Sequence, residues 1–551
     1  MNRGCVTRLL RRICLLLLPF LVGCAGAGVP LLDGSGRPLP APFDDPVPAQ
    51  VSGRATYAFL PARSDGRRSF LAFAEEGERP VRRARVALLD EQSTVLSESV
   101  TDESGAFVLG NPGLVARVKV RLFAQTGGQG PRIRVQDNTN GGLLYAADSP
   151  VEDLRQDPVV NLRLSTGYDP VGNVSDPIRP SGAFAVLDSI LTVSLLFQEA
   201  GEDFSLLPET MVNWSVNNST ARGDNSTGAI GTSHFNGQEN ALFILGKANN
   251  DTDEFDWHVM VHEYGHWYQF NAGRNDAPGG PHSFGEVKDG RLAFSEGYGN
   301  ALGAIVLQDP LYRDTKGQLS SDGFTDDLEF NNQADPSTRG WYSEATVGYL
   351  VVDLFDPIDP REPSGLDDRF DLPFSLLREG LLAQRDSAAL TTIFSFLAGL
   401  VGQLDAQDLA ALLAFHTLDQ DFGINATDAF ALAETHDAGN PETLPLFRPA
   451  DALIGAGPQP LSLAATDGNE LTASRFLLLT GTGRSLELEL TSESLSAALY
   501  ENGRQMDRSR LIERPTSVVF PTLPGAVYIL VLTLPNEGQI NTQFSLSEVT
   551  P

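Results

Sequence analysis

The sequence predicts a multidomain protein in which an α+β domain, with a small sheet followed by a mainly helical half, stands between two β-sandwiches. Three observations predict this fold class. The chain has 551 residues, which is too long for one ordinary hydrophobic core. Short runs of alternating apolar and polar residues, separated by Asp and Gly turns, occur toward both ends of the chain. Between these two regions lie apolar runs of helical length.

The first 48 residues predict export followed by a flexible tether. Several arginines precede a short apolar run, Ile13 to Val22, which is too short to span a bilayer as a stable helix. The run ends in Leu21-Val22-Gly23-Cys24, which resembles a bacterial lipobox. This resemblance implies that residues 1–23 are a signal peptide and that Cys24 carries a lipid anchor in the cell envelope, at the outer membrane or cell surface. An ordinary signal peptide or an uncleaved anchor is the alternative. Residues 24–48 are rich in Gly, Pro and Asp and predict the tether.

Charge and cysteine content limit the possible partners. The formal net charge is −31, and such an acidic surface repels phosphate backbones, so nucleic-acid binding is not expected. The cysteines are Cys5, Cys14 and Cys24. Cleavage before Cys24 would leave that residue alone, so no internal disulfide is expected in the exported chain.

Residues 49–165 predict the first β-sandwich. Short strands are expected at Arg85–Leu89, Ser93–Leu96, Ser99–Leu109 and Val118–Phe123. The stretch Thr101 to Phe107, Thr-Asp-x-x-Gly-x-Phe, resembles the transthyretin-like regulatory domains attached to carboxypeptidases and other secreted proteins. That resemblance implies an accessory role for this domain, without catalysis.

Residues 166–445 predict the α+β domain. A buried helix is expected at Phe184–Phe197, and strands at Met211–Val216 and Ala241–Leu245. Further helices are expected at Trp257–Phe270, Phe294–Leu307 and Ser343–Leu354, with two or three more over residues 375–418.

Residues 455–551 return to short strands and predict the second β-sandwich. The strands are expected at 461–463, Arg475–Leu479, Leu486–Leu490, Ala497–Tyr500, Ser517–Phe520 and Val527–Leu532. In texture and position this region resembles the pre-peptidase C-terminal domains that follow many secreted bacterial proteases.

The sequence His262-Glu263-Tyr264-Gly265-His266 predicts a metal centre. Residues four apart lie on one face of a helix, so two imidazoles can bind one zinc ion while Glu263 takes a proton from its water. The surrounding helix is apolar, and four of the seven histidines of the chain lie in this region. A buried helix has little reason to carry these polar groups without a partner. A histidine pair satisfied by hydrogen bonds is the alternative.

A catalytic zinc site needs a third protein ligand. The metzincin pattern is excluded, because Gln269 and Ala272 stand where its Gly and His would be. The helix expected at Phe294–Leu307 instead resembles the second ligand helix of gluzincin peptidases, and its small residues would let it approach the first helix closely. The resemblance implies a zincin-like fold, Glu296 as third ligand and Asn300 as the residue that orients the first histidine. Glu286 is the rival ligand, although it lies in an expected loop.

Other residues are expected to line this centre or support it. His258 lies one turn before His262, so we expect it either to support the ligands from behind or simply to pack in the core. His282 is expected either to line the cleft or to be an ordinary loop histidine. Gluzincins generally stabilise the oxyanion with a Tyr or His, and Tyr342 is the residue expected in that role. Tyr298, Tyr349 and His416 compete with it.

Two acidic stretches have competing interpretations. Residues 251–256, Asp-Thr-Asp-Glu-Phe-Asp, precede the motif helix and predict a solvated helix start or, alternatively, a structural Ca²⁺ site. Residues 326–329, Asp-Asp-Leu-Glu, show the same features more weakly.

These features together predict a surface-anchored zinc metallopeptidase. We expect a peptide or protein substrate, bound by strand addition along Ala241–Leu245. Two rival functions stay open: a zinc hydrolase of a cell-wall or other amide substrate, and a non-catalytic surface lipoprotein that binds ligands through its sandwiches.

Overall fold

The computed structural model describes residues 46–329, 338–355, 370–417, 428–434, 441–466, 470–506, 512–513 and 517–549. Cys24, the expected signal peptide and most of the expected tether lie outside these residues. The chain divides into two units, Met1–Val47 and Pro48–Pro551. The second unit holds every element named below.

The first part of this unit consists of strands. They are β1 (Gln50–Phe59), β2 (Ala62–Ser64), β3 (Ser69–Leu71), β4 (Gly77–Pro80), β5 (Ala84–Asp90), β6 (Val95–Val100), β7 (Ala106–Gly110), β8 (Arg117–Thr126), β9 (Ile133–Asp137), β10 (Leu143–Leu144), β11 (Ala146–Asp148), β12 (Glu152–Asp153) and β13 (Leu162–Leu164). One sheet has the order β13-β1-β4, with β7 also paired to β1, and a second contains β9-β8-β5-β6. Val118, Val120 and Leu122 of β8 are fully buried and alternate with more exposed residues, as expected for a strand with one face in the core.

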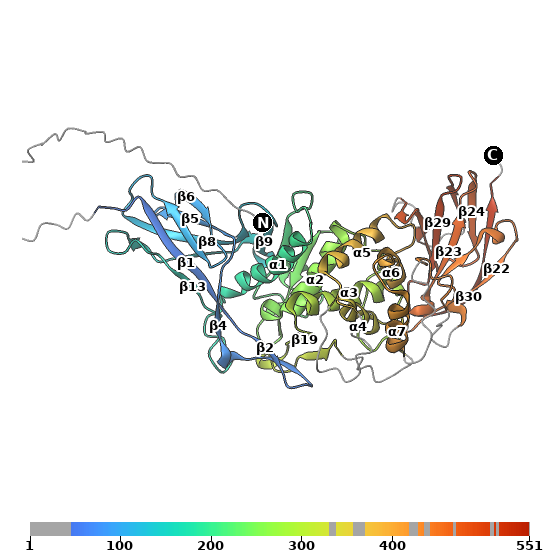
Figure 1. Ribbon diagram of the computed structural model, residues 1–551, viewed down its shortest axis with the longest axis horizontal. Helices are drawn as coiled ribbons and strands as arrows, with labels where there is room; N and C mark the ends of the chain where they lie inside the picture. The colour runs from blue at the N-terminus through green and yellow to red at the C-terminus, as the bar shows by residue number, and fades with distance from the viewer. Residues whose placement is uncertain are drawn as a thin grey trace, which may run out of the picture. The chain divides into compact units, whose positions relative to one another are not determined.

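The second sheet continues past residue 165, where the sequence suggested a domain boundary. Strand β14 (Thr210–Trp214) lies parallel to β9 and also parallel to β16 (Ala241–Ile244). Strand β15 (His234–Asn236) pairs antiparallel with β16 and is the last strand of this sheet in the described part of the chain. One sheet therefore joins the N-terminal strands to the strands that precede the motif helix (Figure 1).

Helix α1 (Ser181–Glu199) packs on this sheet against β8 and β9. It is the one helix among the described residues that is long and apolar enough to span a membrane. Most of its side chains are buried inside the protein, including Phe184, Ile190 and Phe197. Its apolar sequence is therefore explained by a position in the core.

The remaining helices form a block after the sheet. They are α2 (Trp257–Asn271), α3 (Gly290–Leu307), α4 (Glu344–Phe355), α5 (Phe374–Asp386), α6 (Ile393–Leu400) and α7 (Ala406–Thr417). Helix α3 lies between α2 and α4 and contacts both (Figure 1). It begins at Gly290, four residues before the predicted start, because the side chain of Asp289 accepts a hydrogen bond from Arg291 N (2.9 Å) and caps the helix.

Two small two-stranded sheets lie before α2 and after α3 in the chain. Strand β17 (Gly246–Lys247) pairs with β18 (Asp251–Thr252), and β19 (Leu311–Asp314) pairs with β20 (Phe324–Asp327). A short 3-10 helix, η4 (Asp253–Phe255), leads from β18 into α2.

The C-terminal part consists of two further sheets. Their strands are β21 (Phe447–Pro449), β22 (Gln459–Ala465), β23 (Ser474–Thr480), β24 (Ser485–Leu490), β25 (Ser496–Glu501), β26 (Arg504–Gln505), β27 (Ile512–Glu513), β28 (Ser517–Pro521), β29 (Val527–Thr533) and β30 (Gly538–Glu548). One sheet has the order β21-β23-β29-β25-β26, with β27 on β25, and the other has the order β22-β30-β24-β28. Leu477 and Leu530 from the first sheet share one buried cluster with Leu488 and Leu546 from the second. At the level of a multidomain protein with several sheets and a helical block, the predicted fold class is confirmed.

Candidate metal centre

Helix α2 presents His262 and His266 on one buried face. Their Nε2 atoms lie 3.0 Å apart, as the spacing of four residues predicts. The opposite faces of the helix carry Tyr264, Trp267 and Tyr268, which are fully buried. The apolar residues around the motif therefore seat the helix in the core, and the two imidazoles are held in place by that packing.

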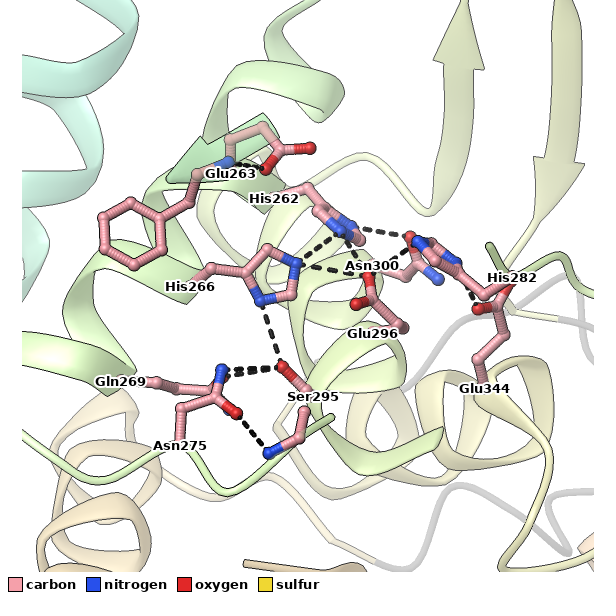
Figure 2. A network of polar contacts seen from close by, with 12 residues as sticks. His262, Glu263, His266, Gln269, Asn275, His282, Ser295, Glu296, Asn300 and Glu344 are labelled. Atoms are coloured by element: carbon pink, nitrogen blue, oxygen red, sulfur yellow. Dashed lines mark hydrogen bonds and ion pairs between the residues drawn. The ribbon is translucent and has the colours of Figure 1, made fainter. Parts of the chain in front are cut away.

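Glu296 reaches the two histidines from α3. Its Oε2 atom lies 3.1 Å from Nε2 of His262 and 3.2 Å from Nε2 of His266 (Figure 2). Zinc bonds of about 2.0–2.1 Å in tetrahedral geometry place neighbouring ligand atoms about 3.3 Å apart, close to this triangle. His262, His266 and Glu296 can therefore hold a metal ion.

Hydrogen bonds behind the imidazoles set their tautomers. Nδ1 of His262 lies 2.9 Å from Oδ1 of Asn300, and an amide oxygen can only accept, so Nδ1 carries the proton. Nδ1 of His266 lies 3.1 Å from Oγ of Ser295, and that hydroxyl in turn donates to Oε1 of Gln269 (3.1 Å). In these tautomers the Nε2 atom of each ring carries a lone pair, and both lone pairs face the Glu296 carboxylate. Three electron-pair donors this close together repel one another unless a cation lies among them.

A glycine allows the two helices to approach. A Cβ atom on Gly299 would lie 2.8 Å from Nδ1 of His262, closer than any side chain can tolerate. The prediction that small residues let α3 approach the motif helix is therefore confirmed at this residue.

The charge of Glu296 suits a metal ligand. Burial alone would raise its pKa, but the neighbouring side chains of His266, His262 and His282 outweigh burial and hold the pKa well below its usual range. Glu296 is therefore a carboxylate at neutral pH.

The carboxylate of Glu263 lies outside this triangle, on the side that faces the sheet (Figure 2). Its Oε2 atom accepts a hydrogen bond from the backbone N–H of Phe235 in β15 (2.9 Å). Burial raises the pKa of Glu263 to about 7, with a counteracting contribution from His262 and a further increase from the Glu296 charge. A carboxyl group with this pKa can both take and return a proton near neutral pH.

His282 lies on the more exposed side of the centre. Its Nε2 atom is 3.3 Å from Oε2 of Glu296, and its Nδ1 atom is 2.7 Å from Oε2 of Glu344 at the start of α4. The His282 side chain is 34% exposed, compared with 7% for His262. Burial lowers the pKa of His282, but the hydrogen bond to Glu344 and the charge of Glu296 raise it more, to about 9. These contacts place His282 beside the metal group, and its position in a cleft stays a prediction.

Tyr342 does not offer the hydroxyl proton that its expected role requires. The side chain is fully buried, and the hydroxyl donates to the backbone carbonyl of Arg339 (2.8 Å). A tyrosine has one such proton, so this bond occupies it. Of its competitors, Tyr298 is fully buried in α3, the Tyr349 hydroxyl donates to Asp326 (2.7 Å), and His416 pairs with Asp353 (2.7 Å).

Two further predicted positions lie elsewhere. His258 is buried, and its Nε2 atom lies 2.9 Å from the carbonyl oxygen of Asp309, so it packs at the end of α3 and does not orient His262. Glu286, the rival ligand, pairs with Lys288 (3.0 Å) and is absent from the metal group.

Sequence reasoning missed three residues that complete the network. Gln269 and Ser295 stand behind His266, and Glu344 stands behind His282. Gln269 lies three residues after His266 on the same helical face, and Ser295 directly precedes Glu296, so spacing could have indicated both. Glu344 comes from a separate helix, and no local pattern connects it to His282.

The acidic stretch before α2 is buried, so its interpretation as a solvated helix start is wrong. All six residues from Asp251 to Asp256 are buried. Asp251 and Asp253 lie close to Asp314 of β19, and these three form the second group of possible metal ligands among the described residues. In the second stretch, Asp326 accepts the hydrogen bond from Tyr349.

Comparison with known proteins leaves the chain without an assigned family. No protein-family model and no curated protein sequence matches it. Among solved structures, a β-glucosidase from Paenibacillus barengoltzii aligns with 10% identity over 90% of this chain and 70% of its own, with a TM-score of 0.11. That score is too low to bear on fold or function.

Proposed function

We propose that this protein is a zinc-dependent peptidase of the gluzincin type, with a zincin-like catalytic domain. The main support for the proposal is that His262 and His266, on one buried helix, lie within 3.2 Å of Glu296 on the next helix. Two imidazoles and one carboxylate form the ligand set of catalytic zinc sites, which keep a further position open. Zinc bound there would act as a Lewis acid toward the substrate carbonyl and lower the pKa of a water molecule.

Glu263 acts as the general base in this proposal. It accepts a proton from the attacking water and then passes that proton to the leaving nitrogen. A pKa of about 7, caused mainly by burial, suits both steps. The hydrogen bond from Phe235 N–H keeps the carboxylate oriented beside the ligand helix.

In this proposal His282 stabilises the oxyanion, the role that the sequence suggested for Tyr342. Its Nε2–H is directed toward the metal ligands, and Glu344 holds the opposite side of the ring. A fixed positive donor at this position would stabilise the negative charge that develops on the carbonyl oxygen. Its partial exposure leaves it accessible to a bound substrate.

The substrate binds along β15 in this proposal and not along Ala241–Leu245. Strand β16 already pairs with β14 on one side and with β15 on the other, so strand addition there is excluded. Strand β15 ends the sheet as described, and the N–H of Phe235 faces Glu263. An extended peptide added to this outer edge would lie beside the catalytic residues.

Our proposal also includes a position at a membrane. We propose a lipid anchor at Cys24, export to the cell envelope and accessory roles for the two groups of sheets that flank the catalytic domain. The substrate would then be a peptide or protein outside the cytoplasm.

Turnover on alternative substrates tests this function. The purified protein should cleave casein, and a zinc chelator should abolish the cleavage until zinc is restored. The protein could instead release products from isolated cell wall in a zinc-dependent reaction and leave casein intact. That result would show that it hydrolyses another amide bond and is not a peptidase. Bound zinc without turnover of either substrate would favour a binding protein.

A further inference from the structure

A second cluster of carboxylates lies just before the metal-binding helix. Asp251 begins β18, Asp253 begins η4, and Asp314 ends β19. One carboxylate oxygen from each residue lies within 4.8 Å of the other two. More than sixty residues separate the first two from the third, so the fold, and not the local sequence, assembles the cluster.

The carboxylates of this cluster carry oxygens that nothing in the described chain satisfies. Asp251 and Asp253 are 9% and 3% exposed, and the Oδ1 atom of each is buried without a hydrogen-bond partner. The same is true of Oδ1 of Asp256, which is fully buried next to them. Buried carboxylate oxygens are very rarely left in this state, because removing a charge from water is costly unless a partner replaces the water.

The second carboxylate oxygens of Asp253 and Asp256 accept hydrogen bonds from the protein. Oδ2 of Asp253 accepts a hydrogen bond from Oγ of Ser233 (2.5 Å), and Oδ2 of Asp256 accepts one from the backbone N–H of Thr315 (2.6 Å). The two carboxylates are therefore held in position, each with one oxygen left over.

The described part of the chain supplies no paired cation to the cluster. Among the described residues, no lysine or arginine forms an ion pair with Asp251, Asp253, Asp256 or Asp314. Glu254, in the same stretch, shows the contrast, because Arg179 pairs with it at 2.5 Å. The charge of Lys316 lowers the pKa of Asp251 and Asp314, but burial raises the pKa of all four aspartates more, so the described chain only partly compensates the cluster.

The backbone around the cluster is fixed by contacts between distant segments. Asp251 forms an isolated antiparallel bridge with Lys316, and Thr252 Oγ1 lies 2.9 Å from Ser320 Oγ. Ser69 Oγ, from the N-terminal strands, donates to the backbone oxygens of Asp314 and Phe324. These contacts connect the segments that carry the cluster to one another and to the N-terminal strands.

We propose that Asp251, Asp253 and Asp314 bind a calcium ion, with Asp256 adding its charge from beside them. All donors are oxygens, which hard divalent cations prefer. Calcium is favoured over magnesium, because magnesium keeps several waters and is usually held by one or two carboxylates, whereas calcium accepts a nearly complete cage of protein oxygens. The ion would connect the hairpin β19–β20 to the segment from which α2 starts.

Calcium titration of the purified protein tests this site without using hydrolysis. The metal-depleted protein should bind one calcium per chain in isothermal titration, and its Tm should rise by several degrees with calcium concentration. Sodium chloride of matched ionic strength should not reproduce the increase, and magnesium should give a much smaller one. Zinc content is measured in every sample, so a change at the histidine site is recognised separately.

Two variants and one control decide the assignment. Asp253→Asn and Asp314→Asn should weaken calcium binding by on the order of 100-fold, because affinity depends on the number of charged ligands. Their Tm without calcium should equal or exceed that of the wild type, since each change removes repulsion between buried charges. Asp322→Asn, on the same hairpin but exposed and paired with Arg68, should keep the full calcium response.

Several results would overturn the proposal. If calcium raises the Tm of the wild type no more than sodium chloride does, the protein has no calcium site. A full response in both Asp253→Asn and Asp314→Asn places the ion elsewhere. An equal response to magnesium contradicts the calcium assignment. None of these results depends on whether the protein is a peptidase.

Discussion

The ring of His262 lies directly against the backbone of Gly299, where a Cβ atom would be 2.8 Å from Nδ1. Replacing Gly299 with Ala should therefore displace the imidazole and reduce zinc content to well below one per chain, although Ala favours a helix by about 1 kcal/mol over Gly. Metal analysis of the purified variant checks this. Gly303→Ala, whose Cβ would meet His258 at 3.3 Å, is the control and should keep its zinc. Equal zinc in both variants would show that the close approach has no part in metal binding.

Asn300 sets the tautomer of His262, because its Oδ1 accepts a hydrogen bond from Nδ1–H of the ring (2.9 Å). Asn300→Ala should weaken zinc binding by roughly 10–100-fold, as is usual when a ligand loses such a partner. Asn300→Asp should keep or tighten binding, because a carboxylate accepts the same hydrogen bond and increases the basicity of the ring. Competition with a chromogenic chelator measures both affinities. If alanine and aspartate behave alike, the hydrogen bond does not orient the ligand.

His282 and Glu344 form a pair beside the metal group, 2.7 Å apart. If His282 stabilises the oxyanion, His282→Ala should keep one zinc per chain and lower kcat by roughly 10²–10³-fold with little change in KM. Glu344→Gln should lower kcat less, since the ring stays but loses its charged partner. Steady-state kinetics beside metal analysis separates the roles. Loss of zinc from His282→Ala would make His282 a ligand and contradict the assignment.

His258 should make the fold sensitive to acid. Burial lowers its pKa from the usual value of about 6.5 to about 4. The folded state therefore binds this proton less readily than the unfolded state, so stability is complete above pH 6.5 and falls as the pH drops toward 4. The loss amounts to at most about 3.5 kcal/mol, because each pKa unit corresponds to about 1.4 kcal/mol.

Urea unfolding of the metal-free protein at pH 7 and pH 4.5 measures this effect, with His258→Gln as comparison. Glutamine can donate the hydrogen bond to Asp309 but does not titrate. The wild type should lose more stability than the variant between the two pH values. An equal loss in both proteins would mean that the buried histidine does not couple folding to pH.

The local sequence was sufficient for the parts of the site that lie on single helices. The spacing of His262 and His266 follows from helix geometry, and Glu296 was found because a second apolar helix with small residues followed the first. Helix lengths were predicted to within a few residues, since their apolar patterns are long.

Contacts between distant segments could not be predicted in this way. The pairing of β14 with β9 crosses the expected domain boundary at residue 165, because local alternation shows that a strand exists but not which strand lies beside it. The approach of Glu344 to His282 and of Asp314 to Asp251 depends on tertiary packing for the same reason. The role of Tyr342 at the oxyanion could not be judged from the sequence, because a tyrosine at a helix start gives no indication of where its hydroxyl points.

The most direct test of the account compares zinc content and casein cleavage of the purified wild type with those of Glu263→Gln. Glu263 lies on the ligand helix but outside the metal group, so the substitution should leave zinc at one per chain. Cleavage should fall by at least about 10²–10⁴-fold, because the amide cannot accept the proton of the attacking water. Zinc near one per chain in both proteins, with cleavage only in the wild type, is the predicted result. Absence of zinc from both, or equal cleavage by both, would contradict a zinc peptidase with Glu263 as its base.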